Sequence, residues 1–295
     1  MPASLEPRHF SRTRLSKGVA LGLLLTAGSC AAWAGDYQLL PIETRPAQTL
    51  SGITLDASYR YFTDMTLDEA DNFDGWTADF DLTIPFMDRF QLRVFLPVYT
   101  KGDAKLRQDN LYQRKGDSVD IHGAGGIWDF PSVELEHQIM FERDRGFNLA
   151  YYVGAGRIIK PLDTDLINGD KYNHRGSVGM GGIKTDGDVW GDQVRLLGNF
   201  GFRYYWDTDD LNPEGKSAFG TADIKGAAVF QPWGRIYPVL ELTYLGDFGD
   251  LNITTLMPEI IFPFNENLEL KAGVPIGLGG DGNQFGALAQ LTYRF

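Results

Sequence analysis

The sequence predicts an all-β protein: a single transmembrane, antiparallel, up-and-down β-barrel of about twelve strands with both termini in the periplasm. Three observations lead to this fold class. Residues 1–34 have the pattern of an export leader, most of the remaining chain alternates between apolar and polar residues, and the last eleven residues read as a strand with one apolar face. Alternation with period two is typical of strands that separate two different environments.

The leader has the three parts of a signal peptide. Four basic residues precede an apolar run from Val19 to Ala27, and Ala32-Trp33-Ala34 offers a small-x-small cleavage site. The apolar run is too short to span a membrane as an anchor. Residues 1–34 are therefore predicted to be a cleaved signal peptide. Cys30 leaves a lipoprotein cysteine open as an alternative, with Ala rather than Leu at the third position before it.

Two regions are expected after the leader. Residues 35–50 are rich in Leu, Pro and Thr and are predicted to be a periplasmic N-terminal segment, either a mobile tail or a plug in the barrel mouth. Residues 51–295 are predicted to form the outer-membrane barrel. This part of the chain contains no cysteine, so neither disulfides nor thiol chemistry are expected.

The charge of the chain excludes one class of partner. The leader holds four basic residues and one acidic residue, so 23 Lys and Arg remain against 38 Asp and Glu, a net charge of −15. Such an acidic chain is not expected to bind nucleic acid.

Strands are expected wherever the alternation is regular. In the first strand Leu55, Ala57 and Tyr59 share one face, while Asp56 and Ser58 share the other. The second covers about 76–84 and the third about 90–101. Further strands are predicted near 132–143, 147–160, 192–206, 218–231, 235–246, 252–264, 268–279 and 284–295.

A twelfth strand follows from topology rather than from pattern. Bacterial barrels have an even number of strands, short periplasmic turns and longer outer loops. Eleven strands would place the short turns 232–234 and 265–267 outside, so a strand is inserted at about 174–186, where the sequence is rich in glycine.

Two prolines also recur at the same spacing. Residues 85–98 align without gaps on residues 263–276, and in both copies a second proline follows twelve residues after the first. Since proline removes a ladder hydrogen bond, these pairs are expected near the two rims of the wall.

The final strand carries a further expectation. Its apolar face is followed by the terminal Phe295, which resembles the C-terminal signature of outer-membrane barrels, where it serves as the assembly signal. The outer-membrane assembly machinery is therefore an expected partner. Outer-membrane lipid and lipopolysaccharide are expected on the outward face, where aromatic residues such as Trp76 and Phe90 lie beside the predicted turns.

Short motifs carry one family resemblance. Thr83-Ile84-Pro85-Phe86, then residues 92–98 (Leu-Arg-Val-Phe-Leu-Pro-Val), and the terminal Leu291-Thr292-Tyr293-Arg294-Phe295 resemble the transporter-like outer-membrane barrels named for the meta-pathway of phenol degradation. The resemblance implies a channel for small, often aromatic or hydrophobic, compounds. It transfers no functional residues.

The inward face supplies the candidate site. Acidic and basic residues are nearly balanced there, whereas an ion-selective pore shows one dominant sign. The interpretation is a narrow lumen in which charges pair across strands and small solutes pass. The candidate lumen residues are Arg60, Asp79, Asp81, Arg93, Glu134, Glu136, Arg195, Arg203, Arg235, Glu241 and Lys271.

Catalytic and metal sites are not predicted. No His-x-Ser pair of a barrel lipase is present. Asp120-Ile121-His122 matches half of the surface proteases of the omptin type, and Asp79 with Asp81 could match the other half, but only from mid-strand. Residues 163–169 look like a calcium loop with the spacing one residue wrong. No cofactor is expected.

Three functions follow in order. The first is an outer-membrane channel for passive passage of small molecules through a narrow mixed-charge lumen. The second is a non-conducting structural or assembly barrel of an envelope or secretion complex. The remote third is an omptin-like surface hydrolase.

Overall fold

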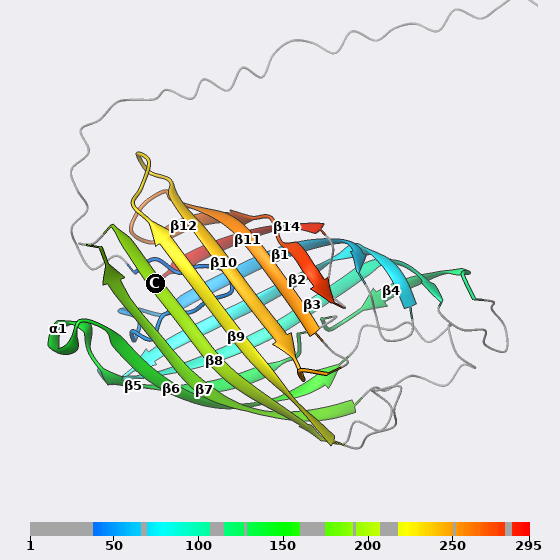
Figure 1. Ribbon diagram of the computed structural model, residues 1–295, viewed down its shortest axis with the longest axis horizontal. Coiled ribbons are helices and arrows are strands. Elements are labelled where there is room, and N and C mark those ends of the chain that lie inside the picture. The colour runs from blue at the N-terminus through cyan, green and yellow to red at the C-terminus, as the bar shows by residue number, and fades with distance from the viewer. Residues whose placement is uncertain are drawn as a thin grey trace, which may run out of the picture. The chain divides into compact units, whose positions relative to one another are not determined.

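The computed structural model describes residues 38–65, 70–106, 115–126, 129–159, 175–190, 193–206, 218–249, 252–280 and 285–295. These residues form antiparallel strands that wind into a barrel (Figure 1). The elements are β1 (Thr54–Met65), β2 (Ala70–Phe86), β3 (Phe90–Leu106), β4 (Ser118–Gly123), β5 (Ser132–Met140), α1 (Glu142–Arg145), β6 (Asn148–Ile159), β7 (Arg175–Val189), β8 (Val194–Trp206), β9 (Ala218–Phe230), β10 (Tyr237–Gly246), β11 (Asn252–Pro263), β12 (Leu268–Gly273), β13 (Ile276–Gly280) and β14 (Phe285–Arg294).

The wall is closed by its first and last strands. β1 pairs with β14 from Thr54 opposite Arg294 to Thr63 opposite Phe285. β12 and β13 occupy one place in the wall, because both pair with β11 and β14 and only two residues separate them. β4 lies off this path and pairs with the outer part of β3. Within the described residues the wall therefore has twelve strand positions, as predicted.

The register also fixes the direction of the strands. Thr54, at the start of β1, pairs with Thr83 beside the short turn that follows β2. Arg294, at the end of β14, pairs with Thr54 as well. Both ends of the barrel chain thus lie at the rim with the short turns, which in bacterial barrels is the periplasmic rim. The predicted topology is confirmed.

The glycine-rich strand is real, and its glycines have a steric reason. β7 spans Arg175–Val189 and pairs with β6 and β8 along its length. Gly182 lies directly opposite Tyr152 on one side and Gly201 on the other. A Cβ at either glycine would run into the Tyr152 ring or its hydroxyl. The missing side chains make room for an inward tyrosine, which explains why the alternation is weak here.

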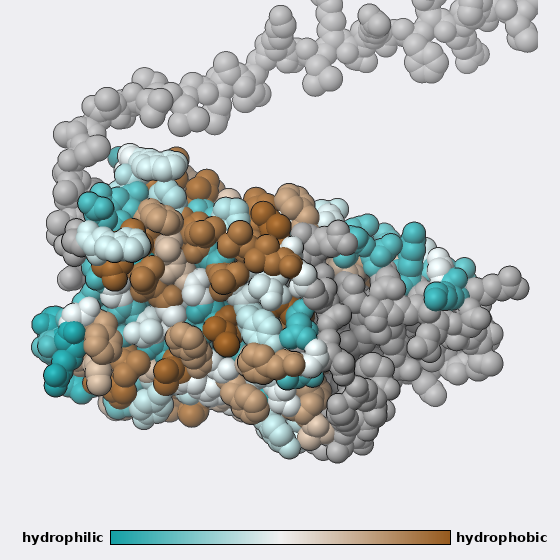
Figure 2. Space-filling model, in the orientation of Figure 1, coloured by the Kyte–Doolittle hydropathy of each residue, from teal (hydrophilic) through white to brown (hydrophobic). Residues whose placement is uncertain are grey.

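The distribution of side chains is inverted relative to a water-soluble protein. Asp56, Asp81 and Lys271 are buried inside the barrel, whereas Phe200 and Leu242 are half exposed on its outer surface. Figure 2 shows apolar side chains over the middle of the wall and hydrophilic ones at the end that carries α1. No helix among the described residues is long and apolar enough to cross a membrane. The apolar outer surface suits contact with lipid hydrocarbon, where charged side chains are costly.

Aromatic side chains gather near the rims of this apolar surface. Tyr59, Trp76 and Tyr99 come from three neighbouring strands, with ring centroids 5.4 and 5.8 Å apart. Near the other rim the rings of Phe90 and His137 stack at 4.2 Å. This placement agrees with the expected interface girdles.

Some strand boundaries differ from the prediction. β4 was expected to be part of a loop, and β2 and β3 are each 17 residues long. About ten residues suffice to cross the membrane, so β2 and β3 continue past it and β4 pairs with the extension. The second prolines do not mark a rim. Pro97 lies at a register shift between β2 and β3, and Pro275 lies in the gap between β12 and β13, where a lost ladder donor is tolerated.

The packing around β7 gives a stability prediction. Gly182→Ala places a Cβ against the carbonyl oxygen of Phe200 and the Cα of Gly201, so it should cost about 1–3 kcal/mol through overpacking. Urea unfolding in lipid vesicles, followed by tryptophan fluorescence, measures this loss. Gly226→Ala on β9 is the matched control, because its nearest contact is 3.8 Å away. Equal stability of the two variants would contradict the steric account.

Candidate functional site

The lumen contains part of the chain that precedes the barrel. Residues 38–50 run inside the wall near the short-turn rim (Figure 1, blue) and have no regular secondary structure. Leu40, Ile42 and Ala47 are almost fully buried. Pro41 and Pro46 interrupt any helix or ladder that this short stretch could form. Its main-chain N–H groups must therefore find partners among side chains.

Side chains of the wall supply those partners. Six main-chain N–H groups of the segment donate to carboxylate or amide oxygens that point into the lumen. The donors and acceptors are Ile42 to Glu259 at 3.2 Å, Glu43 and Thr44 to Glu241 at 3.1 and 2.9 Å, Ala47 to Asp186 at 2.7 Å, Thr49 to Gln138 at 2.9 Å, and Leu50 to Gln91 at 3.0 Å. The acceptors come from β3, β5, β7, β10 and β11, so the wall holds the segment from several sides.

Arg45 anchors the middle of the segment. Its Nη2 lies 2.7 Å from a carboxylate oxygen of Asp56 and 3.0 Å from one of Asp81. Burial would lower the pKa of Arg45, but the charges of Asp56 and Asp81 outweigh burial and raise it. With its amide oriented to satisfy both ends, Asn199 accepts from the N–H of Arg45 at 2.9 Å. Charge and backbone are thus recognised at the same residue.

Glu43 is held by the opposite sign. Its carboxylate pairs with Arg60, and its Oε2 lies 3.2 Å from Nζ of Lys225. Burial would raise the pKa of Glu43, but Arg60 and then Lys225 outweigh it and hold the pKa far below its usual value of 4.5. A lowered pKa means that these ion pairs contribute fully above about pH 4.5 and are lost only well below it.

The wall around the segment is a network of ion pairs. Arg93 lies 2.5 Å from Asp81 and 3.4 Å from Glu134. Lys184 lies 2.5 Å from Glu136 and 3.9 Å from Glu134, so the network runs continuously from β2 to β7. Each charge in it satisfies another, which lowers the cost of taking them out of water.

A second part of the network closes the seam of the barrel. Lys271 is fully buried and lies 3.2 Å from Glu269 and 3.8 Å from Asp56. It also donates to the amide oxygen of Gln290 at 3.1 Å. Arg294 lies 3.1 Å from the other oxygen of Glu269. These contacts join β12, β14 and β1 from the inside.

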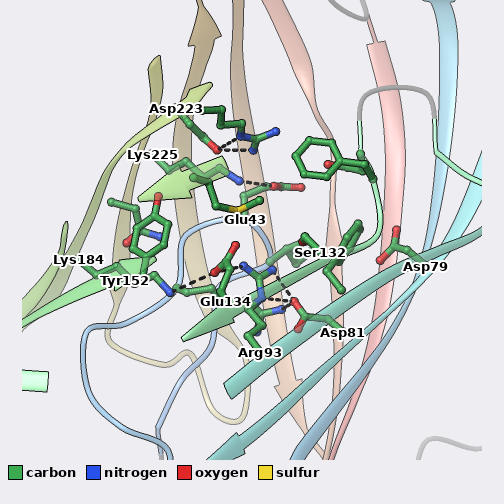
Figure 3. Close-up of a pocket in the computed structure, with 18 of the residues that line it drawn as sticks. Glu43, Asp79, Asp81, Arg93, Ser132, Glu134, Tyr152, Lys184, Asp223 and Lys225 are labelled. Carbon is green, nitrogen blue, oxygen red and sulfur yellow. Dashed lines mark hydrogen bonds and ion pairs between the residues drawn. The ribbon is translucent and has the colours of Figure 1, made fainter. Parts of the chain in front are cut away.

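A cavity of about 80 Å³ remains above the segment (Figure 3). Six basic and six acidic side chains line it, beside an apolar side formed mainly by Phe95, Phe130, Tyr152 and Met180. The balance of signs gives no preference for anions or cations. Pockets that bind small molecules usually measure ~300–1,000 Å³, so with the segment in place this cavity suits water rather than a solute.

Ten of the eleven candidate residues face the lumen. Those that line the cavity are Arg60, Asp79, Asp81, Arg93, Glu134 and Arg203. Those that are buried in the wall around the segment are Glu136, Glu241 and Lys271. Arg195 lies close to the short-turn rim, where it pairs with Asp186, with Asp188 at 3.0 Å and with Glu142 at 2.9 Å.

Arg235 is a correction. It was placed on the inner face of a strand starting at 235, but β10 starts at Tyr237. Trp233 and Ile236 close a tight turn around it, and Arg235 is exposed. Alternation cannot locate the first residue of a strand beside such a turn, because the turn residues continue the same polar pattern.

Other lumen residues were missed by sequence reasoning. Glu43 and Arg45 lie in a segment whose position the sequence left open, and Lys184 lies on the strand with the weakest alternation. The two prolines at 41 and 46 were the available signal, because they show that the segment must be satisfied by something other than its own backbone.

The hydrolase hypothesis gains no support from geometry. Asp120 and His122 lie on β4, with Oδ2 and Nδ1 3.5 Å apart. Asp120 pairs with Asp103 of β3, whereas Asp79 pairs with Pro97. The six intervening residues separate the two pairs by roughly 20 Å at ~3.3 Å per residue. Asp79 and Asp81 are also engaged by Arg60 and Arg45.

Metal ligands do not cluster in the part of the chain that the structure describes. The calcium-like stretch 163–169 and the acidic cluster from Asp207 to Glu214 lie outside the described residues.

Comparison with solved structures supports the fold. The COG4313 outer membrane channel from Pseudomonas putida F1 superimposes with a TM-score of 0.54 at 14% identity, covering 88% of this chain and 98% of that chain. The fold is that of an outer-membrane β-barrel. This fold and the lipid-compatible outer surface place the protein in the outer membrane.

Two further structures resemble the chain more loosely. The KdgM porin in complex with disordered oligogalacturonate has a TM-score of 0.46 at 10% identity, with 82% of this chain and 99% of that chain covered. The β domain of the Bordetella autotransporter BrkA has a TM-score of 0.48 at 11% identity, with 83% and 100% covered. No family model and no curated protein matches the sequence.

The buried network gives a second stability prediction. Lys271→Met should destabilise the barrel by roughly 3 kcal/mol, because Asp56 and Glu269 lose a buried cation. Adding Glu269→Gln should recover part of this loss. Urea unfolding in vesicles measures both variants. Arg143→Met is the control: its pair with Asp144 is solvent-exposed, so it should change stability by less than about 1 kcal/mol. Equal losses for Lys271→Met and Arg143→Met would refute the network.

Proposed function

We propose that this protein is an outer-membrane channel for passive passage of small molecules, and that residues 38–50 close its periplasmic end. The observation that carries the proposal is the nature of the closure. The lumen is obstructed by a segment without secondary structure that is tied to the wall only through side chains. Displacing the segment would leave a polar passage without changing any strand pairing.

The width and lining of the lumen limit the solutes. A twelve-stranded barrel is much narrower than the sixteen- to eighteen-stranded porins, so the passage would admit small molecules only. Paired charges along most of the lumen and an apolar side with Phe95, Phe130 and Tyr152 suit solutes with both polar and apolar parts. The resemblance to barrels of the meta-pathway of phenol degradation supports hydrophobic or aromatic compounds. The candidate lumen residues are proposed to form the solute path.

Two proposals concern export and assembly. Residues 1–34 would be removed during export, which would leave residues 35–50 as the new N-terminal segment. The strand that ends at Phe295 would be read by the outer-membrane assembly machinery. No chemical step is part of the proposed function.

Permeability of vesicles tests the channel. Proteoliposomes with the mature chain should swell slowly in small sugars and organic acids. A variant without residues 35–50 should swell several-fold faster, with rates that depend on solute size, because its lumen is open. Gln48→Ala is the matched control, since it keeps the segment and its anchors in place. Absence of solute-dependent swelling both with and without residues 35–50 would rule out a channel.

The second candidate is a non-conducting structural or assembly barrel. It is favoured by the continuous network that links the segment to β1, β2 and β3 through Arg45, Asp56, Asp81 and Arg93, because a permanent plug needs such anchoring. Zero single-channel conductance for both forms, together with envelope proteins that co-purify with the mature chain, would favour this candidate.

A further inference from the structure

The wall recognises residues 42–50 largely through their backbone. Glu259, Glu241 and Asp186 accept main-chain N–H groups, as do the amide oxygens of Gln138 and Gln91. Every residue except proline offers such an N–H. These five contacts therefore hold an extended chain of almost any sequence, and they fix its position in the lumen.

Side-chain specificity is confined to two positions. The acidic residue at 43 meets Arg60 and Lys225, and the arginine at 45 meets Asp56 and Asp81. Side chains two residues apart in an extended chain point to the same side. Proline at 46 fits as well, because it has no N–H to satisfy and favours extended backbone.

An empty lumen would leave unmatched charges on the wall. Asp56 and Asp81 are each less than 3% exposed while Arg45 is present. Truncating one partner of a buried ion pair is strongly unfavourable, because the other charge stays buried and unpaired. A second chain with the same charge pattern would relieve this cost, so the wall is built to accept a replacement.

We propose that the periplasmic half of the lumen is a peptide-binding site, specific for an extended peptide with an acidic residue two positions before an arginine. Residues 38–50 are its resident ligand and exchange with a peptide of this pattern supplied in trans. The inference deepens the proposed function, in which the same segment closes the channel, since a peptide that takes its place would keep the lumen closed.

The test keeps the barrel intact and changes only the ligand. A protease site is inserted after the exposed Ser51, in the link between the segment and β1, and the mature chain is cleaved after folding. The released segment should co-elute with the barrel in size-exclusion chromatography. A fluorescent synthetic peptide of residues 36–51 should then replace it, with saturable binding in fluorescence polarisation. Since the barrel folds with its own segment in place, misfolding does not enter the result.

Peptide variants report specificity. The peptide with Arg45→Ala should bind at least about a hundredfold more weakly, because two buried carboxylates lose their cation. Glu43→Gln should weaken binding by about tenfold, since its hydrogen bonds remain but its charge is lost. Gln48→Ala should stay within about twofold of the native peptide, as substitutions away from such anchors do.

Two results would overturn the inference. One is dissociation of the cleaved segment with no saturable binding of the native peptide, and the other is equal binding of the native and Arg45→Ala peptides. Both readouts are independent of transport. A barrel that binds the peptide but never conducts would refute the channel and leave the peptide site standing, and a conducting barrel without peptide binding would do the reverse.

Discussion

Lipid hydrocarbon offers no hydrogen-bond partners, and this constraint governs the rest of the structure. Every main-chain N–H and C=O group within the membrane must be satisfied by the protein itself, which for strands requires a sheet without edges. The pairing of β1 with β14 removes the last edge. Closure then separates two solvents, and alternate side chains along each strand face one or the other.

The inner face inherits a second requirement from the first. Charges are costly on the lipid side, so they collect inside, where the lumen is too narrow to hydrate them fully. Asp81 illustrates the outcome, since Arg93 of the wall and Arg45 of the segment both reach it. Residues 38–50 lack secondary structure and bring N–H donors, while Glu241 and Glu259 bring acceptors. Wall and segment satisfy each other, which is why the contacts can both close the lumen and select a ligand.

Sequence reasoning succeeded where one periodicity and one topological rule sufficed. Alternation located eleven strands, and the parity of bacterial barrels located β7, whose own pattern is obscured by Gly182 and its neighbours. It failed where local pattern carries no information. Arg235 continues the polar alternation into a turn, and β4 forms only because β2 and β3 extend past the membrane.

The sequence by itself determined which side of the wall each strand residue faces, because a strand has a period of two and the two solvents differ. Only the tertiary structure decided which charges meet. Arg45 reaches Asp56 and Asp81, and Ala47 reaches Asp186, 139 residues away in the chain, because closure brings every inward side chain to one narrow axis. No local pattern encodes those distances, since they depend on the register of all the strands between.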